Sequence, residues 1–283
     1  HCFHIQALSM TDEPIVFLID NGSLRPEATF WLRCLADGLS SRAELTVEPV
    51  SLLHSHKVPA EKLDGRAATI VRRRLRECIE AGHRRFVFLP LFFGPSLAIS
   101  DYLPQLIEEG RELAADLNVR VADVLAGSDP DNPDPRLAEM LADQVKALNP
   151  KSDTRVALVD HGTPAEPVNR VRNAVAHQLN ALLKGLVTGV QPCSMERRDG
   201  DAYAFNDPLL ESLGEISGFA GGRLILAMFF LLPGRHAGEG GDVAEIYAGL
   251  IAGNAFEQIE TTPLLGEHPG LFSILEDRLR AVV

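Results

Sequence analysis

Hydrophobic residues along this chain gather in short runs without alternation, separated by longer stretches with helical periodicity. Residues 15–19 form the first clear run, and residues 156–159 form a later one. A β-branched, apolar run of this length is typical of a strand that is covered on both faces. One helical stripe, with spacings of three and four, consists of Val168, Val171, Val175, Leu179 and Leu182. Strands that alternate with such helices predict parallel sheets built from right-handed crossovers.

The same order of residues occurs twice along the chain. The first run ends in Asp-Asn-Gly-Ser at residues 20–23, and the later run ends in Asp-His-Gly-Thr at residues 160–163. Residues 47–53 match residues 190–196 at valine, proline and serine, in the same order. The sequence therefore predicts an α/β protein of two similar doubly wound lobes, each with a mostly parallel sheet flanked by helices.

A third pair sets residues 86–93 beside residues 224–230, and each run ends in two phenylalanines. We expect these phenylalanines to belong to the core, because they continue apolar strands. The halves are expected to join at residues 148–153, where a helix breaks at a proline. With the boundary near residue 152, the N-terminal lobe covers residues 10–151 and the C-terminal lobe covers residues 152–283.

Length and composition restrict the class of protein. A chain of 283 residues suits one large domain or two of about 140, and the repetition favours two. With 46% hydrophobic and 23% charged residues, the composition is that of a globular protein whose apolar runs are too short to span a bilayer. The net charge of -12 disfavours nucleic acid and anionic lipid as partners.

Cysteine usage and the first residues bear on the compartment. The four cysteines form no CxxC pair, so neither a zinc knuckle nor an iron–sulfur site is expected; they are Cys2, Cys34, Cys78 and Cys193. A reducing, cytoplasmic compartment fits this pattern. Residues 1–9 lack the basic start and apolar core of a secretory signal, and we interpret them as upstream sequence before a natural start at Met10.

Three side chains able to bind metal or accept protons follow predicted strands of the second half. His161 follows the run at residues 156–159, Glu196 closes the strand near residues 192–195, and His236 lies in the loop after the next strand. In open parallel sheets, ligands bind outside the carboxyl ends of the strands. We therefore expect these three residues to share one cleft.

The first half lacks such side chains at the matching positions. These positions are Asn21, Leu53 and a place within residues 97–99, none of which offers an imidazole or a carboxylate. The site is accordingly expected in the C-terminal lobe alone.

Residues 160–163 and residues 228–236, Met-Phe-Phe-Leu-Leu-Pro-Gly-Arg-His, resemble the two signatures of the class II chelatases. These are the cobalt and ferrous sirohydrochlorin chelatases of the CbiX/SirB type, whose pattern reads approximately apolar-x-His-Gly-Ser and Pro-Leu-Phe-Leu-x-x-Gly-x-His. Two such units in tandem would cover nearly all of residues 15–283. Long tandem forms of the family often carry their histidines in the N-terminal unit, whereas here that unit is the degenerate one.

The chain departs from the family pattern at three places. Met228 stands where the family usually has proline, and Thr163 replaces serine. The glycine-rich residues 238–241 lengthen the stretch between His236 and the usual acidic residue, Asp242. These glycines lack the spacing of a phosphate-binding loop, so no nucleotide is expected, and backbone freedom near a bulky macrocycle is the better interpretation.

The resemblance implies a lyase that inserts a divalent metal, Co²⁺, Fe²⁺ or Ni²⁺, into sirohydrochlorin or a related tetrapyrrole, with the metal as a substrate. His161 and His236 would serve as metal ligands and proton acceptors, assisted by Glu196. Insertion removes two pyrrole protons while the ion sheds water, and neutral imidazole can serve in both steps. Asp160 is expected to orient the His161 ring.

Sirohydrochlorin carries many carboxylates, so Arg235, Arg197 and Arg198 are candidates for contacts with its side chains. Two alternatives stay open: a noncatalytic tetrapyrrole- or metal-binding protein that uses the same cleft, and a chelatase for a less carboxylated porphyrin. We expect a monomer or homodimer with no nucleic-acid or membrane partner.

Three further histidines lie outside the two histidine segments. His54 and His56 are spaced to chelate a metal or to line the mouth of the cleft, although a polar loop needs no such role. His177 lies away from the apolar stripe of its helix and is expected to be exposed.

Overall fold

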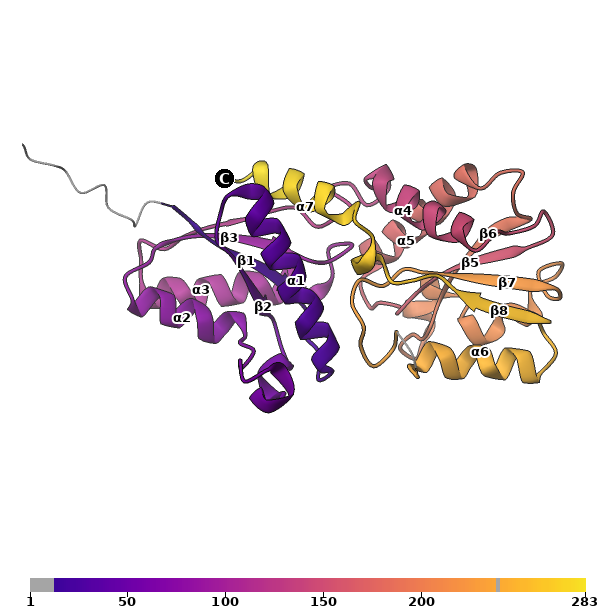
Figure 1. The fold of residues 1–283 in the computed structure, drawn as a ribbon, viewed down its shortest axis with the longest axis horizontal. Helices are drawn as coiled ribbons and strands as arrows, with labels where there is room; N and C mark the ends of the chain where they lie inside the picture. The colour runs from indigo at the N-terminus through magenta and orange to yellow at the C-terminus, as the bar shows by residue number, and fades with distance from the viewer. Residues whose placement is uncertain (1–12, 238–239) are drawn as a thin grey trace, which may run out of the picture.

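The computed structural model describes residues 13–237 and 240–283. The expected start at Met10, the upstream segment 1–9, and Gly238 and Glu239 of the glycine-rich stretch lie outside these ranges. The described residues form two lobes side by side, each built around its own sheet (Figure 1). No helix in the described ranges combines the length and the apolar character needed to cross a membrane.

The first sheet contains four parallel strands in the order β2-β1-β3-β4. Its strands are β1 (Ile15–Asp20), β2 (Val47–Ser51), β3 (Arg85–Pro90) and β4 (Asn118–Val121). The helices between them are α1 (Pro26–Ala43), α2 (Val71–Glu80) and α3 (Leu103–Leu113). The central strand β1 ends beside β2 and β3, so the loops after these three strands meet at one edge.

The second sheet repeats this topology, with four parallel strands in the order β6-β5-β7-β8. Its strands are β5 (Arg155–Asp160), β6 (Gly189–Ser194), β7 (Arg223–Met228) and β8 (Gln258–Thr261). The helices between them are α5 (Glu166–Leu182) and α6 (Asp242–Ala252). The prediction of two similar doubly wound α/β lobes is therefore confirmed.

The strand register tests the pairs of matching segments. Asp20 pairs with Ser51 in the first sheet and Asp160 pairs with Ser194 in the second, as the first two pairs of segments require. The third pair is displaced by one residue. Ile19 lies opposite Pro90 and Val159 lies opposite Met228, so Pro90 is the counterpart of Met228. Two residues further along each chain segment, the counterpart of Phe92 is therefore Phe230 and not Phe229.

The last helix of each half of the chain packs against the lobe that the other half forms. Helix α4 (Pro135–Ala147) packs against α5 and β7, and α7 (Leu271–Arg280) packs against α1 and β3 (Figure 1). Arg136 also donates to Asp277 across 2.7 Å, and Arg278 donates to Asp134 across 2.8 Å. A boundary near residue 152 therefore separates the strands of the two sheets but not their helices.

The exchanged helices join the inner faces of both sheets into one core. Alternate side chains of a strand point to opposite faces, and Val16 and Leu18 of β1 share this core with Val156 and Leu158 of β5. Phe17, on the opposite face of β1, instead packs beneath α2 and α3. Because the two sheets share one packed core, the loops at their facing edges have a fixed relative position.

Helix α5 carries the stripe of apolar residues that the spacing predicts, with one difference at its end. Val171, Val175 and Leu179 are buried, but Leu182 is 41% exposed and Leu183 is buried instead. The chain leaves the helix at this point, so helical spacing no longer decides which side chain faces the core. His177 is exposed, as expected.

Candidate metal centre

A glycine turn at the end of β5 brings His161 beside Glu196. Gly162 has φ of +94°, and a Cβ on it would lie 1.8 Å from the carbonyl oxygen of Glu196, so no other residue fits this turn without rearrangement. The Glu196 amide donates to the His161 carbonyl across 3.2 Å. The loops after β5 and β6 are thus held backbone to backbone.

The first lobe has the same turn with different side chains. Gly22 has φ of +91°, and a Cβ on it would lie 1.7 Å from the carbonyl oxygen of Leu53. The Leu53 amide donates to Asn21 across 3.0 Å. The backbone of the site therefore exists in both lobes, but the first lobe presents an amide and an alkyl group at the positions of His161 and Glu196.

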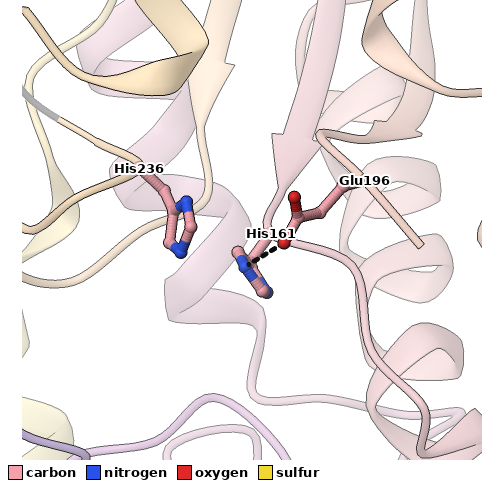
Figure 2. A group of neighbouring side chains, drawn as sticks. All are labelled: His161, Glu196 and His236. Carbon is pink, nitrogen blue, oxygen red and sulfur yellow. Dashed lines mark ion pairs between the residues drawn. The ribbon is translucent and has the colours of Figure 1, made fainter. Parts of the chain in front are cut away.

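His161, Glu196 and His236 converge at the carboxyl ends of β5, β6 and β7, with the His161 ring between the other two side chains (Figure 2). Each offers one ligand atom, and these atoms lie within 4.8 Å of one another. The His161 and His236 ring centroids are 4.3 Å apart, and Nε2 of His161 lies 3.0 Å from Oε1 of Glu196. Two ligands at about 2.1 Å and at right angles around one ion are also about 3.0 Å apart. The spacing of His161 and Glu196 therefore suits shared coordination of one metal ion.

The ring orientations are set by partners of the Nδ1 atoms. Nδ1 of His236 lies 2.9 Å from Oδ2 of Asp242, at the start of α6, and Nδ1 of His161 lies 3.0 Å from the carbonyl of Gly162. The Asp242 carboxylate accepts a hydrogen bond, so Nδ1 of His236 carries the proton and its Nε2 offers a lone pair. Both nitrogens of His161 face acceptors, the Gly162 carbonyl at Nδ1 and the Glu196 carboxylate at Nε2, and its Nε2 offers a lone pair to an ion when the proton lies on Nδ1. The expectation that Asp160 orients His161 is not met, because its Oδ1 accepts from the Gly162 amide and the Ser194 hydroxyl instead.

A buried carboxyl group lies at the end of the central strand in each lobe. Burial raises the pKa of Asp20 to about 6, and its Oδ1 atom has no hydrogen-bond partner. Burial also raises the pKa of Asp160, but the positive charge of the buried Arg172 opposes that effect. The two lobes therefore differ in electrostatics beneath the turn as well as in the side chains above it.

A cavity of about 550 Å³ lies between the two lobes in front of the histidines. The first lobe lines it with residues 20–25, 28, 54, 91–94 and 96, and the second lobe lines it with residues 160–162, 168 and 229–236. The rings of Phe93 and Phe229, one from each lobe, stack with centroids 3.8 Å apart. His161 and His236 line the cavity, whereas Glu196 is not part of the lining. A flat apolar molecule in this cavity would thus meet the imidazoles directly.

The arginines expected to meet substrate carboxylates lie in different places. Arg235 lines the cavity, and its Nε lies 3.6 Å from Oδ2 of Asp242. Arg197 is bound to Asp207 across 2.8 Å, and Arg198 lies over the Tyr203 ring at 5.8 Å. Neither Arg197 nor Arg198 lines the cavity. Both are held by partners in the loop that follows Glu196.

The first lobe supplies two cationic or basic side chains that line the cavity. These are Arg25, whose guanidinium makes no ion pair within the described ranges and which was not among the predicted site residues, and His54. The sequence feature that could have identified Arg25 is a basic residue just after the repeated turn, at the position where the second half has Ala165. His54 also lines the cavity, but His56 does not, and its Nδ1 atom is buried without a hydrogen-bond partner.

Comparisons with known proteins find similarity in structure only. No family model matches the sequence, and no curated protein matches it. SirB from Bacillus subtilis, solved with Fe³⁺, superposes with a TM-score of 0.69 at 13% identity, over 95% of this chain and 94% of SirB. The chain has the fold of the SirB chelatases. The resemblance carried by the two histidine segments is confirmed at the level of this fold.

Two other structures agree with this result. The sirohydrochlorin chelatase SirB from Bacillus subtilis subspecies spizizenii, in complex with cobalt, gives a TM-score of 0.68 at 13% identity, over 95% of this chain and 94% of that one. A multi-domain protein from Deinococcus radiodurans, described as similar to chelatases with two additional domains, gives 0.57 at 15% identity. That match covers 94% of this chain and 54% of the other. The SirB fold therefore extends over nearly the whole chain.

Proposed function

We propose that this chain inserts a divalent metal ion into a sirohydrochlorin-type tetrapyrrole. The observation that carries the proposal is the cluster of His161, Glu196 and His236, with ligand atoms within 4.8 Å of one another beside a cavity between the lobes. The likeness to SirB supports it, because the solved SirB structures are described as a sirohydrochlorin chelatase and as complexes with Fe³⁺ and cobalt.

The donor set suits first-row divalent ions such as Co²⁺, Fe²⁺ and Ni²⁺, for which imidazole is a favourable ligand. The ion is a substrate, received by Nε2 of His161, Nε2 of His236 and a carboxylate oxygen of Glu196. The Asp242 carboxylate accepts from His236 Nδ1, which fixes the tautomer and makes Nε2 a better donor.

Insertion releases two protons from the pyrrole nitrogens as the ion enters the ring. As the ion leaves the protein for the macrocycle, the lone pairs of the imidazoles and of Glu196 become free to accept these protons. His161 Nε2 and Glu196 Oε1 lie 3.0 Å apart, so a proton taken by the imidazole can be shared with the carboxylate. The same three side chains thus release the metal and accept the protons.

The cavity suits the macrocycle on chemical grounds. Its walls are largely apolar, and they include the stacked Phe93 and Phe229 rings, against which a flat conjugated ring packs favourably. Arg25 from the first lobe and Arg235 from the second are placed to bind carboxylates of the substrate. Arg25 therefore joins Arg235 in the substrate-binding role that we had expected of Arg197 and Arg198.

The proposal is tested by an anaerobic insertion assay with sirohydrochlorin and Co²⁺, Fe²⁺ or Ni²⁺, followed by the absorption change of the macrocycle. We expect metallation faster than in protein-free buffer, and slower with His236→Ala. Tight tetrapyrrole and metal binding without faster metallation would instead show a noncatalytic carrier. Turnover of a less carboxylated porphyrin, and not of sirohydrochlorin, would redefine the substrate.

A further inference from the structure

We propose that the buried guanidinium of Arg172 holds His161 and Glu196 at metal-ligand spacing, which makes Arg172 a positioning residue of the metal site. The inference deepens the proposed function: its consequence for turnover rests on that function, whereas its consequence for metal binding does not.

Arg172 lies on the buried side of α5 and is 1% exposed. Its Nη1 atom donates to the hydroxyl of Ser194 across 2.6 Å and to the carbonyl of Asn206 across 2.8 Å. Its Nε and Nη2 atoms donate to Oδ1 of Asn173 across 3.1 and 2.9 Å. The planar fork of arginine is thus bound in three directions, which fixes its position.

One branch of this hydrogen-bond network connects the two chain segments that carry His161 and Glu196. The Ser194 hydroxyl donates to Oδ1 of Asp160 across 2.5 Å, and the same oxygen accepts from the Gly162 amide across 3.1 Å. Asp160 and Gly162 flank His161 in the chain, and Ser194 precedes Glu196 by two residues. A hydroxyl bound by Arg172 therefore connects the backbone of both ligands.

A second branch holds the other end of the turn. The Asn206 side chain accepts from the Thr163 amide across 3.0 Å and donates to the Thr163 carbonyl across 2.9 Å. Arg172 holds Asn206 by its carbonyl. The residues on both sides of His161 are therefore linked to one guanidinium.

The opposite charges of Arg172 and Asp160 favour an intact hydrogen-bond network. A buried guanidinium is costly unless its charge and its donors are compensated. The Asp160 carboxyl, linked to Arg172 through Ser194, is itself 93% buried and supplies the opposite charge. Since both groups are desolvated and hydrogen-bonded to this turn and its supports, a displacement of the turn would leave buried polar groups unpaired.

The first lobe is an internal control for this inference. Asp20 corresponds to Asp160 and Ser51 to Ser194. Twelve residues after its aspartate, the first lobe has the buried Leu32 where the second has Arg172, and the Oδ1 atom of Asp20 lacks a partner. The arginine network thus occurs in the lobe that carries metal ligands and not in the lobe that lacks them.

The test compares Ser194→Ala with Ser51→Ala, the same change at the matching position of the first lobe. Co²⁺ binding is measured by titration of the full-length protein, followed through the visible absorption of the ion, which reports coordination geometry. We expect Ser194→Ala to weaken Co²⁺ binding about 10- to 100-fold and to alter the spectrum, as loss of an outer-shell partner does. Ser51→Ala should change the affinity less than about twofold.

Thermal unfolding separates positioning from mere stability. If Ser194→Ala lowers the melting temperature but keeps the wild-type Co²⁺ affinity and spectrum, the proposal is overturned. Equal loss of affinity in Ser51→Ala overturns it too. Arg172→Lys, which keeps the charge opposite Asp160, should retain more affinity than Arg172→Met; if Arg172→Met does not fold, the serine pair decides the question.

Insertion kinetics distinguish failure of this inference from failure of the proposed function. With sirohydrochlorin as substrate, Ser194→Ala should lower kcat and leave KM for the tetrapyrrole nearly unchanged, because the network holds the metal ligands and includes neither Arg25 nor Arg235, the side chains proposed to bind substrate carboxylates. A wild-type protein that binds Co²⁺ without metallating sirohydrochlorin removes the proposed function but leaves the serine comparison valid. A wild-type protein that does not bind Co²⁺ overturns both.

Discussion

Asp242 accepts a hydrogen bond from Nδ1 of His236 across 2.9 Å, at the point where α6 begins. We expect Asp242→Asn to weaken Co²⁺ binding about 10- to 100-fold, because an outer-shell carboxylate fixes the ring and raises the basicity of Nε2. Glu245→Gln, one turn further along α6 and exposed, is the matched control for loss of charge at this helix end. Titration calorimetry with Co²⁺ measures both, and equal affinities would show that Asp242 has no such role.

Removal of a ligand itself should have a larger effect. His161→Ala and His236→Ala are each expected to weaken Co²⁺ binding by more than about 100-fold, beyond the range for an outer-shell partner, and to abolish most metal insertion. Both side chains border the cavity, so the fold and its circular dichroism spectrum should be unchanged. Asn21→Ala, at the matching position of the first lobe, should leave Co²⁺ affinity unaltered. Anomalous scattering from a Co²⁺ soak would contradict this assignment if the peak lay beside Asn21.

The two glycine turns offer a paired test of the site's backbone. Gly162→Ala and Gly22→Ala each place a Cβ within 2 Å of a carbonyl oxygen at positive φ. Each should lower the free energy of unfolding by more than about 1 kcal/mol, measured in urea. Only Gly162→Ala should also reduce Co²⁺ affinity, because only that turn carries ligands. A similar reduction in Gly22→Ala would mean that the two turns are not independent.

Asp20 predicts a pH dependence of stability. Burial raises its pKa from 3.8 to about 6, so the folded protein holds the proton more tightly than the unfolded chain does. Its favourable contribution is present below about pH 4 and is lost as the pH rises through 6. Asp20→Asn should therefore increase the free energy of unfolding at pH 7.5 by up to about 3 kcal/mol, and by little at pH 4. Asp153→Asn, at an exposed position, is the control; a gain at pH 4 as large as at pH 7.5 would exclude this explanation.

Arg25 is expected to recognise a carboxylate of the tetrapyrrole. Arg25→Ala should raise KM for sirohydrochlorin roughly tenfold or more, since a hydrogen bond to a charged group contributes about 1.5 to 3 kcal/mol. Co²⁺ affinity should not change, because Arg25 belongs to the opposite lobe. Arg197→Ala, whose guanidinium is bound to Asp207 outside the cavity, should leave KM unaltered. Steady-state kinetics that show the reverse order would return this role to Arg197.

The sequence predicts the strands and the place of the histidines because the repeat marks the same turn twice. An apolar run that ends in aspartate, a variable residue and glycine determines where His161 lies, and the matching strand determines where Glu196 lies. The displaced third pair arises because two neighbouring phenylalanines allow two alignments one residue apart. Only the strand register, with Pro90 equivalent to Met228, distinguishes them.

Arg172 escaped prediction for a physical reason. It lies four residues after Val168 and three before Val175, on the apolar side of α5, where an arginine is rarely buried. An arginine within an apolar stripe was the available signal. The partner of each histidine was harder to predict, because it depends on loop conformation: Asp160 is adjacent in sequence yet turns toward Ser194, while Asp242 reaches back to His236.

Because α4 and α7 each pack against the opposite lobe, the cavity between the lobes forms within a single chain. Two separate copies of one lobe that traded their last helices would form a domain-swapped dimer, whose assembly depends on concentration. Here residues 148–154 join the two copies, so the association is intramolecular and acts at a high effective concentration. The imidazoles of one lobe therefore face the guanidinium of Arg25 in the other at any dilution.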